Sequence, residues 1–386
     1  MKVASKRQSG IELLRILLIM NVFLAHGVGL EMSMGLTGVI SVIVNCTVPC
    51  FMLCSGYFGI RRSWEKGVRL EGLVLFAAWF SLGTLVYFGS DGLTKLHSVG
   101  DLMAAVGGPK TLLSFLLPTI SGQQFWFITR YFALFLLAPY INAALDKMDR
   151  RTFEEFLIVG LVIFSVIPTF FFFDFMGKGG KELVYFTLMY CVGRYRRRFG
   201  EFPVFAPQRF SERFREKKSL RRVYWSGIYI FSLMAQLVCN FSFLFINGTV
   251  SNYFSRDLSF FVFLQAIALF ELFVEMDFYS SFINRFAASA LMGYLLDMTL
   301  KRIVVAVIRD CGIAPFTQFW AFMQGGDVRK FILILMVGVI VFILAVLLNE
   351  LRLLIFGRLE KVVSDKLETL SGKVMKLLYA KDTDCI

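Results

Sequence analysis

The sequence predicts an all-α, polytopic integral membrane protein with about ten transmembrane helices and cytoplasmic N- and C-termini. Of the 386 residues, 57% are hydrophobic and only 18% are charged, whereas soluble domains have about 25% charged residues. The mean hydropathy is +0.67. Apolar stretches near the spanning length of about 20 residues recur along the chain, and basic clusters lie between them.

The apolar stretches give the expected helices in order. They lie at 11–30, 36–59, 70–89, 124–145, 153–173, 183–193, 223–246, 258–276, 284–300 and 331–356. The basic start of the chain resembles a signal peptide, but further apolar segments follow and no cleavage site is evident, so we expect the first helix to be retained. The run Leu112–Leu117 is too short to span and ends at Pro118, which favours a re-entrant or interfacial piece.

The Lys and Arg residues between these helices predict their orientation. By the positive-inside rule, the basic clusters face the cytoplasm. Because they alternate with the helices, both termini lie inside and the number of helices is even. The clusters are Lys2, Lys6 and Arg7; Arg61, Arg62, Lys66 and Arg69; Lys147, Arg150 and Arg151; residues 194–222; Arg285; and the chain from Arg358 onward.

The two longest basic segments suggest a domain organisation. Residues 194–222 hold eleven Lys or Arg against three Glu, and we interpret them as a cytoplasmic linker between two halves that contacts anionic lipid headgroups. The tail 358–386 has apolar residues at helical spacing and is expected to form an amphipathic helix on the inner leaflet. The transmembrane domain would then cover residues 1–357.

Other classes of function are disfavoured by the pattern of charge and cysteine. The net charge is +13, but the Lys and Arg residues sit between hydrophobic runs rather than on one domain face, so no nucleic-acid partner is expected. Seven Cys residues fall mostly in apolar segments and imply no disulfide framework. Cys46, Cys50 and Cys54 share a helix face, which is more typical of small packing residues than of a metal site.

The first helix carries three ionisable side chains, which are costly at membrane depth and therefore mark a functional hypothesis. Glu12 and Arg15 are three residues apart and can pair on one face near the cytoplasm. His26 lies about 16 Å further along the same face. A neutral imidazole is suited to take a proton from a hydroxyl group, whereas the alternative for a lone intramembrane His is a hydrogen bond between helices.

Five motifs resemble membrane-bound acyltransferase family 3. The run RQSGIELLRILLIMNVFLAHG contains Arg15 and His26 with ten residues between them, preceded by the acidic Glu12. NCTVPCFMLCSGYFG, which begins at Asn45, is similar to the second helix of that family, and FWFITRYFALFLLAP is similar to a later helix. YCVGRY and NRFAASALMGYLLD follow in the expected order, so the resemblance covers nearly the whole chain.

The resemblance implies transfer of an acyl group, usually acetyl from cytoplasmic acetyl-CoA, to a hydroxyl of a cell-envelope polysaccharide or lipid-linked glycan. It implies a bacterial cytoplasmic membrane location. His26 would be the general base, Arg15 would meet the donor, and Glu12 would hold Arg15. Lys66 and Arg69 resemble a donor-binding Arg-x-x-Arg element of part of the family, although ordinary topology charge explains them equally.

Two positions depart from the family pattern. Asp297 stands where many relatives have a second histidine, which either reduces activity or moves proton handling to a carboxylate. Arg130 replaces a small or apolar residue and needs an acidic or carbonyl partner, for which Asp297 and Glu271 are candidates. With Asn45, Trp126 and Tyr131, these two residues are the expected wall of the substrate cavity, although Trp126 and Tyr131 would also suit interface anchors.

Two alternatives to an acyltransferase stay open at the level of sequence. A transporter or flippase of envelope precursors would also have about ten helices and buried charges, but no internal repeat is evident. An inactive relative of the family with a scaffold role would account for Asp297.

Overall fold

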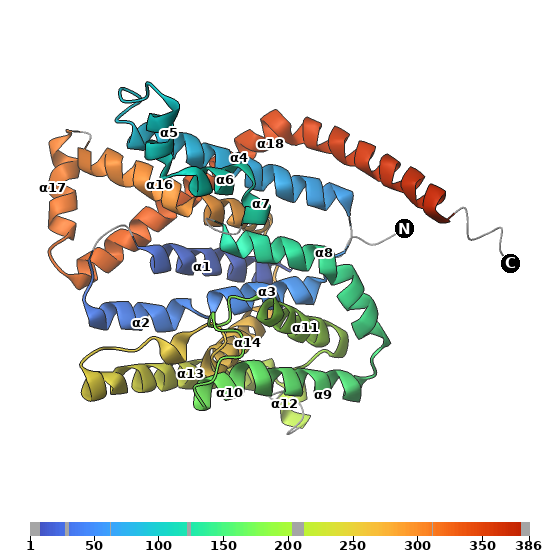
Figure 1. The fold of residues 1–386 in the computed structure, drawn as a ribbon. Coiled ribbons are helices and arrows are strands. Elements are labelled where there is room, and N and C mark those ends of the chain that lie inside the picture. Colours follow the sequence, from blue (N-terminus) through green and yellow to red (C-terminus); the bar gives the residue numbers. More distant parts are fainter. Residues whose placement is uncertain are drawn as a thin grey trace. The chain divides into compact units, whose positions relative to one another are not determined.

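The computed structural model describes residues 8–27, 31–61, 63–121, 125–202, 212–310 and 312–379. These residues form helices and no strand (Figure 1). Eight helical segments among them are long and apolar enough to cross a membrane: Ser9–His26, Met34–Phe58, Trp64–Gly89, Trp126–Lys147, Arg150–Phe170, Lys218–Asn247, Tyr253–Val274 and Asp327–Lys373. The predicted fold class, an all-α polytopic membrane protein, is confirmed.

The helices follow the predicted order, with several breaks inside the predicted segments. Their bounds are α1 (Ser9–His26), α2 (Met34–Val44), α3 (Thr47–Phe58), α4 (Trp64–Gly89), α5 (Val99–Val106), α6 (Pro109–Leu116), α7 (Pro118–Ser121), α8 (Trp126–Lys147), α9 (Arg150–Leu161), the π-helix η1 (Val162–Val166), α10 (Ile167–Phe170), α11 (Leu183–Phe199), α12 (Glu212–Glu216), α13 (Lys218–Asn247), the 3-10 helix η3 (Tyr253–Ser255), α14 (Phe260–Val274), α15 (Ser281–Ala287), α16 (Ala290–Asp310), α17 (Ala314–Met323) and α18 (Asp327–Tyr379).

The sixth predicted span corresponds to α11, and the ninth, 284–300, is divided between α15 and α16. Neither α11 nor α16 is among the candidate membrane spans. The 17-residue α11 carries Arg196, Arg197 and Arg198 in its last turn. In the 21-residue α16, Asp297 lies inside the predicted span 284–300, and Lys301 directly follows it. Eight of the ten predicted segments are therefore clear candidates for spanning, and the count of ten stays a prediction.

Helices also extend into the segment 194–222 that was predicted to be a linker. The helix α11 continues to Phe199, and α13 begins at Lys218. Residues 203–211, in the middle of that segment, lie outside the described residues.

Asp149 caps α9 on the connection between α8 and α9. Hydrogen bonds from Thr152 hold the pKa of the Asp149 carboxyl below its usual value.

The chain divides into two compact units. The first contains residues 1–60 and 130–342, and the second contains residues 61–129 and 343–386. In the first unit, α1 packs against α2, α3, α14, α15 and α16, while α3 packs against α11 and α13 packs against α14. The proposed division into residues 1–357 and a tail stays a prediction, and α18 continues through residue 357 without a break.

Two glycines allow α3 and α11 to approach closely, and both lie in motifs that suggested the family. A Cβ atom on Gly56 would lie 2.0 Å from the carbonyl oxygen of Tyr190, and one on Gly193 would lie 2.3 Å from the carbonyl oxygen of Leu53. Small residues at such crossings let helix backbones meet in a membrane, where packing rather than the hydrophobic effect drives association.

One end of the first unit is held by buried pairs of opposite charge. The Arg196 guanidinium pairs with Glu271, whose side chain is 1% exposed, and Arg221 pairs with Glu275. The N-terminal turn of α1 lies at the same end, because a Cβ on Gly10 would be 2.3 Å from the Phe273 carbonyl oxygen. An unpaired charge here would be costly, so these pairs fix α11, α13 and α14 to one another.

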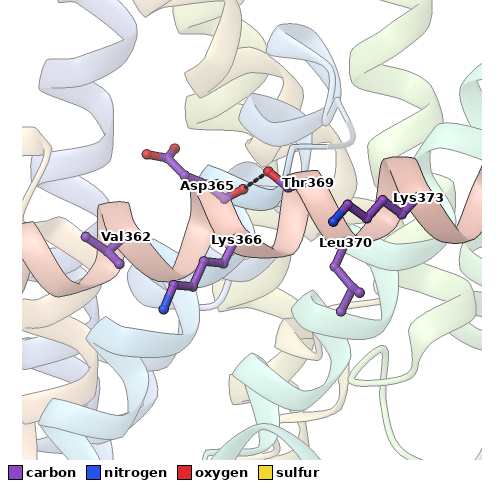
Figure 2. Close-up of a pocket in the computed structure, with 6 residues that line it drawn as sticks. All are labelled: Val362, Asp365, Lys366, Thr369, Leu370 and Lys373. Carbon is purple, nitrogen blue, oxygen red and sulfur yellow. Dashed lines mark hydrogen bonds between the residues drawn. The ribbon is translucent and has the colours of Figure 1, made fainter.

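In the second unit, a helical tail extends the apolar part of α18. Arg352 pairs with Glu360, and a hollow of about 540 Å³ lies along the tail. Figure 2 shows its lining on α18, with Thr369 bonded to the Asp365 carbonyl oxygen and Lys366 and Leu370 pointing to one side. The six lining residues are Val362, Asp365, Lys366, Thr369, Leu370 and Lys373. No histidine is among them, so the candidate site is sought at the ionisable residues of α1.

The first prediction concerns the contact between α3 and α11. Gly193→Val should destabilise the protein strongly, by about 1–3 kcal/mol or more, because its side chain would meet the backbone of α3 and force the helices apart. Thermal unfolding in detergent micelles measures the change. Gly227→Ala on α13, where a Cβ would meet nothing within 4 Å, is the control and should unfold near the wild-type temperature. A Gly193→Val protein as stable as the control would contradict this account of the crossing.

Candidate active site

The first turns of α1 hold the predicted acid and arginine together. The Glu12 side chain is 6% exposed, and its Oε2 atom lies 3.2 Å from Nη1 of Arg15. An acidic side chain in the first turn also interacts favourably with the positive end of the helix dipole. The predicted pair is therefore present, with the Arg15 side chain 36% exposed at the surface of its unit.

The last turn of α1 brings His26 to Asp297 of α16. His26 Nδ1 lies 2.5 Å from Asp297 Oδ2, although 271 residues separate the two in sequence. The Asp297 side chain is 1% exposed and the His26 side chain is 43% exposed. A buried carboxylate that binds Nδ1 favours the tautomer with hydrogen on Nδ1, which leaves the Nε2 lone pair available as a base.

Lys301, one turn after Asp297, completes this cluster. Its Nζ atom lies 2.7 Å from Asp297 Oδ1 and donates a hydrogen bond of 2.6 Å to the Phe23 carbonyl oxygen. The Lys301 side chain is 4% exposed. The Phe23 carbonyl belongs to the last turn of α1, where carbonyls have no partner inside the helix. Asp297 is thus contacted by a cation on one oxygen and by the imidazole on the other.

The sequence of α16 explains why both side chains face α1. Gly293, Asp297, Leu300 and Lys301 recur at helical spacing, so they share one face. A Cβ on Gly293 would lie 3.3 Å from Ile19 and 3.4 Å from Phe23, and its absence permits a close approach. Lys301 was not predicted as a site residue, because the predicted apolar stretch ends at residue 300. Its four-residue spacing from Asp297 was the signal that could have revealed it.

The residues predicted to form the cavity wall are distributed over several elements. Asn45 lies at the break between α2 and α3, and its amide donates a 2.5 Å hydrogen bond to the Ser255 carbonyl oxygen. Arg130 and Tyr131 are half-buried on α8 in the first unit. Trp126, also half-buried, begins α8 and belongs to the second unit.

The partners suggested for Arg130 have other contacts. Glu271 pairs with Arg196, and Asp297 contacts His26 and Lys301.

The predicted donor-binding pair, Lys66 and Arg69, lies near the start of α4 in the second unit. Both side chains are exposed. Arg69 pairs with Glu65, 2.8 Å away, over one helical turn. The structure therefore brings Glu12 to Arg15 and His26 to Asp297 within the first unit, while Lys66, Arg69 and Trp126 belong to the second.

A further cationic residue lies in the segment 194–222, which was predicted to be a linker. Arg197 donates a 3.2 Å hydrogen bond to the Tyr57 hydroxyl, and its guanidinium carbon lies 5.1 Å from the centre of the Tyr57 ring. On the same helix, Arg194 pairs with Asp146 and Arg196 pairs with Glu271. Within the described part of the chain, no carboxylate pairs with Arg197, and a guanidinium of this kind can bind an anion.

The comparisons with known proteins identify the family of the chain. Residues 8–350 match the model of acyltransferase family 3, described as an acyltransferase domain. Neither the curated proteins nor the solved structures give a match. The matched range contains Glu12, Arg15, His26, Asp297 and Lys301, and it covers nearly the whole chain. The chain therefore belongs to acyltransferase family 3.

Proposed function

We propose that this membrane acyltransferase transfers an acetyl group from cytoplasmic acetyl-CoA to a hydroxyl of a cell-envelope polysaccharide or lipid-linked glycan. The observation that carries the proposal is the contact of 2.5 Å between His26 Nδ1 and Asp297 Oδ2. It supports a general base of defined tautomer, on a side chain that is 43% exposed, within the helix that carries the family motif. We propose the bacterial cytoplasmic membrane as the location, which suits an envelope acceptor.

The proposed reaction needs one proton acceptor and one leaving thiol. An acceptor hydroxyl near Nε2 of His26 gives its proton to the imidazole while its oxygen attacks the thioester carbonyl carbon. The new ester C–O bond forms, the C–S bond breaks, and CoA leaves as a thiolate. The imidazolium then returns the proton to that thiolate, which leaves His26 neutral for another cycle. Asp297 stabilises the imidazolium between these two steps.

Two guanidinium groups support a donor site at the other end of α1. Arg15 is held by Glu12, and Arg197 is held by Tyr57. Both lie at the end of the first unit marked by Gly10, Glu271 and the last turn of α11. Guanidinium groups bind phosphates well, and the anionic part of CoA suits this end. Lys66 and Arg69 stay candidates for the donor contact.

The site also bears on the rival hypotheses. Asp297 motivated an inactive relative, since it replaces a histidine of the family. Its position beside His26 instead favours proton handling by a carboxylate and an imidazole together. A transporter would also have buried charges, but the match to the acyltransferase family over residues 8–350 supports the enzyme.

The function is tested with purified protein reconstituted in lipid nanodiscs. Radiolabelled acetyl-CoA is supplied with envelope glycan fractions, and ester-linked label and free thiol are measured together. Equal amounts of both products, dependent on the acceptor, are expected. Absence of label transfer with every envelope fraction, despite binding of acetyl-CoA, would reject the proposal; movement of intact glycan across liposomes would favour the transporter.

The second prediction concerns His26. His26→Ala should lower the rate of transfer by about 10²–10⁴-fold, the usual contribution of general acid–base catalysis. Binding of acetyl-CoA should persist, because the proposed donor contacts lie about 16 Å away along α1. Steady-state rates and equilibrium binding measure the two effects. His97→Ala, in the connection between α4 and α5, is the matched control and should keep the wild-type rate.

The third prediction concerns Arg15. Arg15→Lys keeps the charge but loses the planar group that Glu12 orients, so transfer should fall by about tenfold or more and the KM for acetyl-CoA should rise. A Lys variant with normal KM and kcat would reduce Arg15 to a charge that sets topology.

The fourth prediction concerns Arg197. Arg197→Met should weaken acetyl-CoA binding by about tenfold, which corresponds to about 1.4 kcal/mol, and should leave kcat nearly unchanged at saturating donor. Isothermal titration gives the affinity. Arg222→Met, which removes an equal charge from an exposed position on α13, is the control. Equal weakening by both variants would indicate a general effect of charge rather than a site at Arg197.

A further inference from the structure

Lys301 is a buried cation for which the proposed reaction has so far no role. Its side chain is 4% exposed, and burying an ammonium group is costly unless it is paired. Two contacts compensate the cost: the ion pair of 2.7 Å with Asp297 Oδ1 and the hydrogen bond of 2.6 Å to the Phe23 carbonyl oxygen. The Phe23 ring, whose centre lies 5.5 Å from Nζ, adds a cation–π contact.

Asp297 therefore faces two groups that compete for its charge. An unpaired carboxylate beside an imidazole stabilises the protonated imidazole, so the free base forms only at a higher pH. A second cation on the other carboxylate oxygen weakens that effect, because the pair of Asp297 and Lys301 is neutral as a unit. The imidazole keeps its orienting bond to Oδ2 without the full pull of an isolated negative charge.

Other charged groups on the elements around α1 lie toward its Ser9 end, are exposed, or are bonded to other groups. The helix α2 has none. Glu271 on α14, Tyr57 on α3 and Arg285 on α15 lie toward the Ser9 end of α1, as shown by the contacts Gly10–Phe273, Tyr57–Phe270 and Ser9–Asn284. On α16, Arg302 is exposed. The first turn of α18 is bonded to the chain before α2: Asp327 to Ser33, and Lys330 to the Glu31 carbonyl oxygen.

We propose that Lys301 is a positioning residue that limits the pull of Asp297 on a proton at His26, by pairing with Asp297 and by holding the last turn of α1. The proposal rests on the proposed function for its catalytic meaning, but the effect on His26 can be measured without any activity. A purely structural role, in which Lys301 only caps α1, would not change the protonation of His26.

The substitution Lys301→Gln separates charge from capping. The Gln amide can still donate to the Phe23 carbonyl oxygen, but it carries no charge. Loss of the cation leaves Asp297 free to stabilise the imidazolium, so His26 should stay protonated to a pH about one to three units higher than in the wild type. Lys301→Arg keeps the charge and should titrate near the wild-type pH.

The measurement uses the small number of histidines in the chain. There are two, and His97→Gln leaves His26 as the sole histidine. In a nanodisc sample with ¹⁵N-labelled histidine, the ring nitrogen shifts report the protonation and tautomer of His26 directly as the pH is varied. Asp297→Asn should move the titration to lower pH, opposite in sign to Lys301→Gln. Arg302→Met, one residue away but exposed, should not move it.

The outcomes separate the inference from the proposed function. A Lys301→Gln protein that titrates at the wild-type pH while unfolding at a lower temperature overturns the proposal and leaves Lys301 as a helix cap. Should Lys301→Gln fail to fold, the neutral variant Lys301→Met takes its place, and its titration at the wild-type pH would overturn the proposal. The acid limb of the pH–rate profile should follow the NMR titration in each variant. Absence of acyl transfer with the expected NMR shifts would reject the function and keep the inference about His26.

Discussion

Pairing of buried charge is the constraint on which the described structure depends. Charged side chains within apolar surroundings must meet opposite charges or backbone carbonyls. Asp297 satisfies this requirement with His26 and Lys301, and it thereby joins α16 to the last turn of α1. At the other end of the first unit, Arg196 and Glu271 join α11 to α14. The same contacts that hold the helices also determine which side chains have a free lone pair or an uncompensated charge.

Much of the architecture could be predicted from sequence because lipid imposes simple rules on length and charge. Apolar stretches of spanning length gave the order of the helices, and Glu12 and Arg15 pair as their spacing predicted. The breaks were less visible. The single segment predicted over 36–59 is divided at Asn45 and Cys46 into α2 and α3. Pro49 lacks the N–H that would bond to the Asn45 carbonyl oxygen, which is a local reason for that break.

The partners of the buried charges could not be predicted, because they depend on contacts between residues far apart in the chain. Asp297 was recognised as a departure from the family pattern, yet nothing in the sequence placed it beside His26. Lys301 lay just beyond a predicted helix, and Arg197 lay in a supposed linker. Basic residues near helix ends satisfy the positive-inside rule wherever they point, so a site residue and a topology charge have the same signature in sequence.

The separation of His26 and Asp297 along the chain has a consequence for biogenesis. The two residues are 271 positions apart, and at a synthesis rate of about 5–20 residues per second, α16 emerges about 14–54 seconds after α1. Until then, the Phe23 carbonyl oxygen in the last turn of α1 lacks the hydrogen bond from Lys301. The helix α16, with a carboxylate and an ammonium group one turn apart, enters lipid poorly by itself and gains its partners from a helix already inserted. Assembly of the candidate site is thus a late step that requires both α1 and α16 in the membrane.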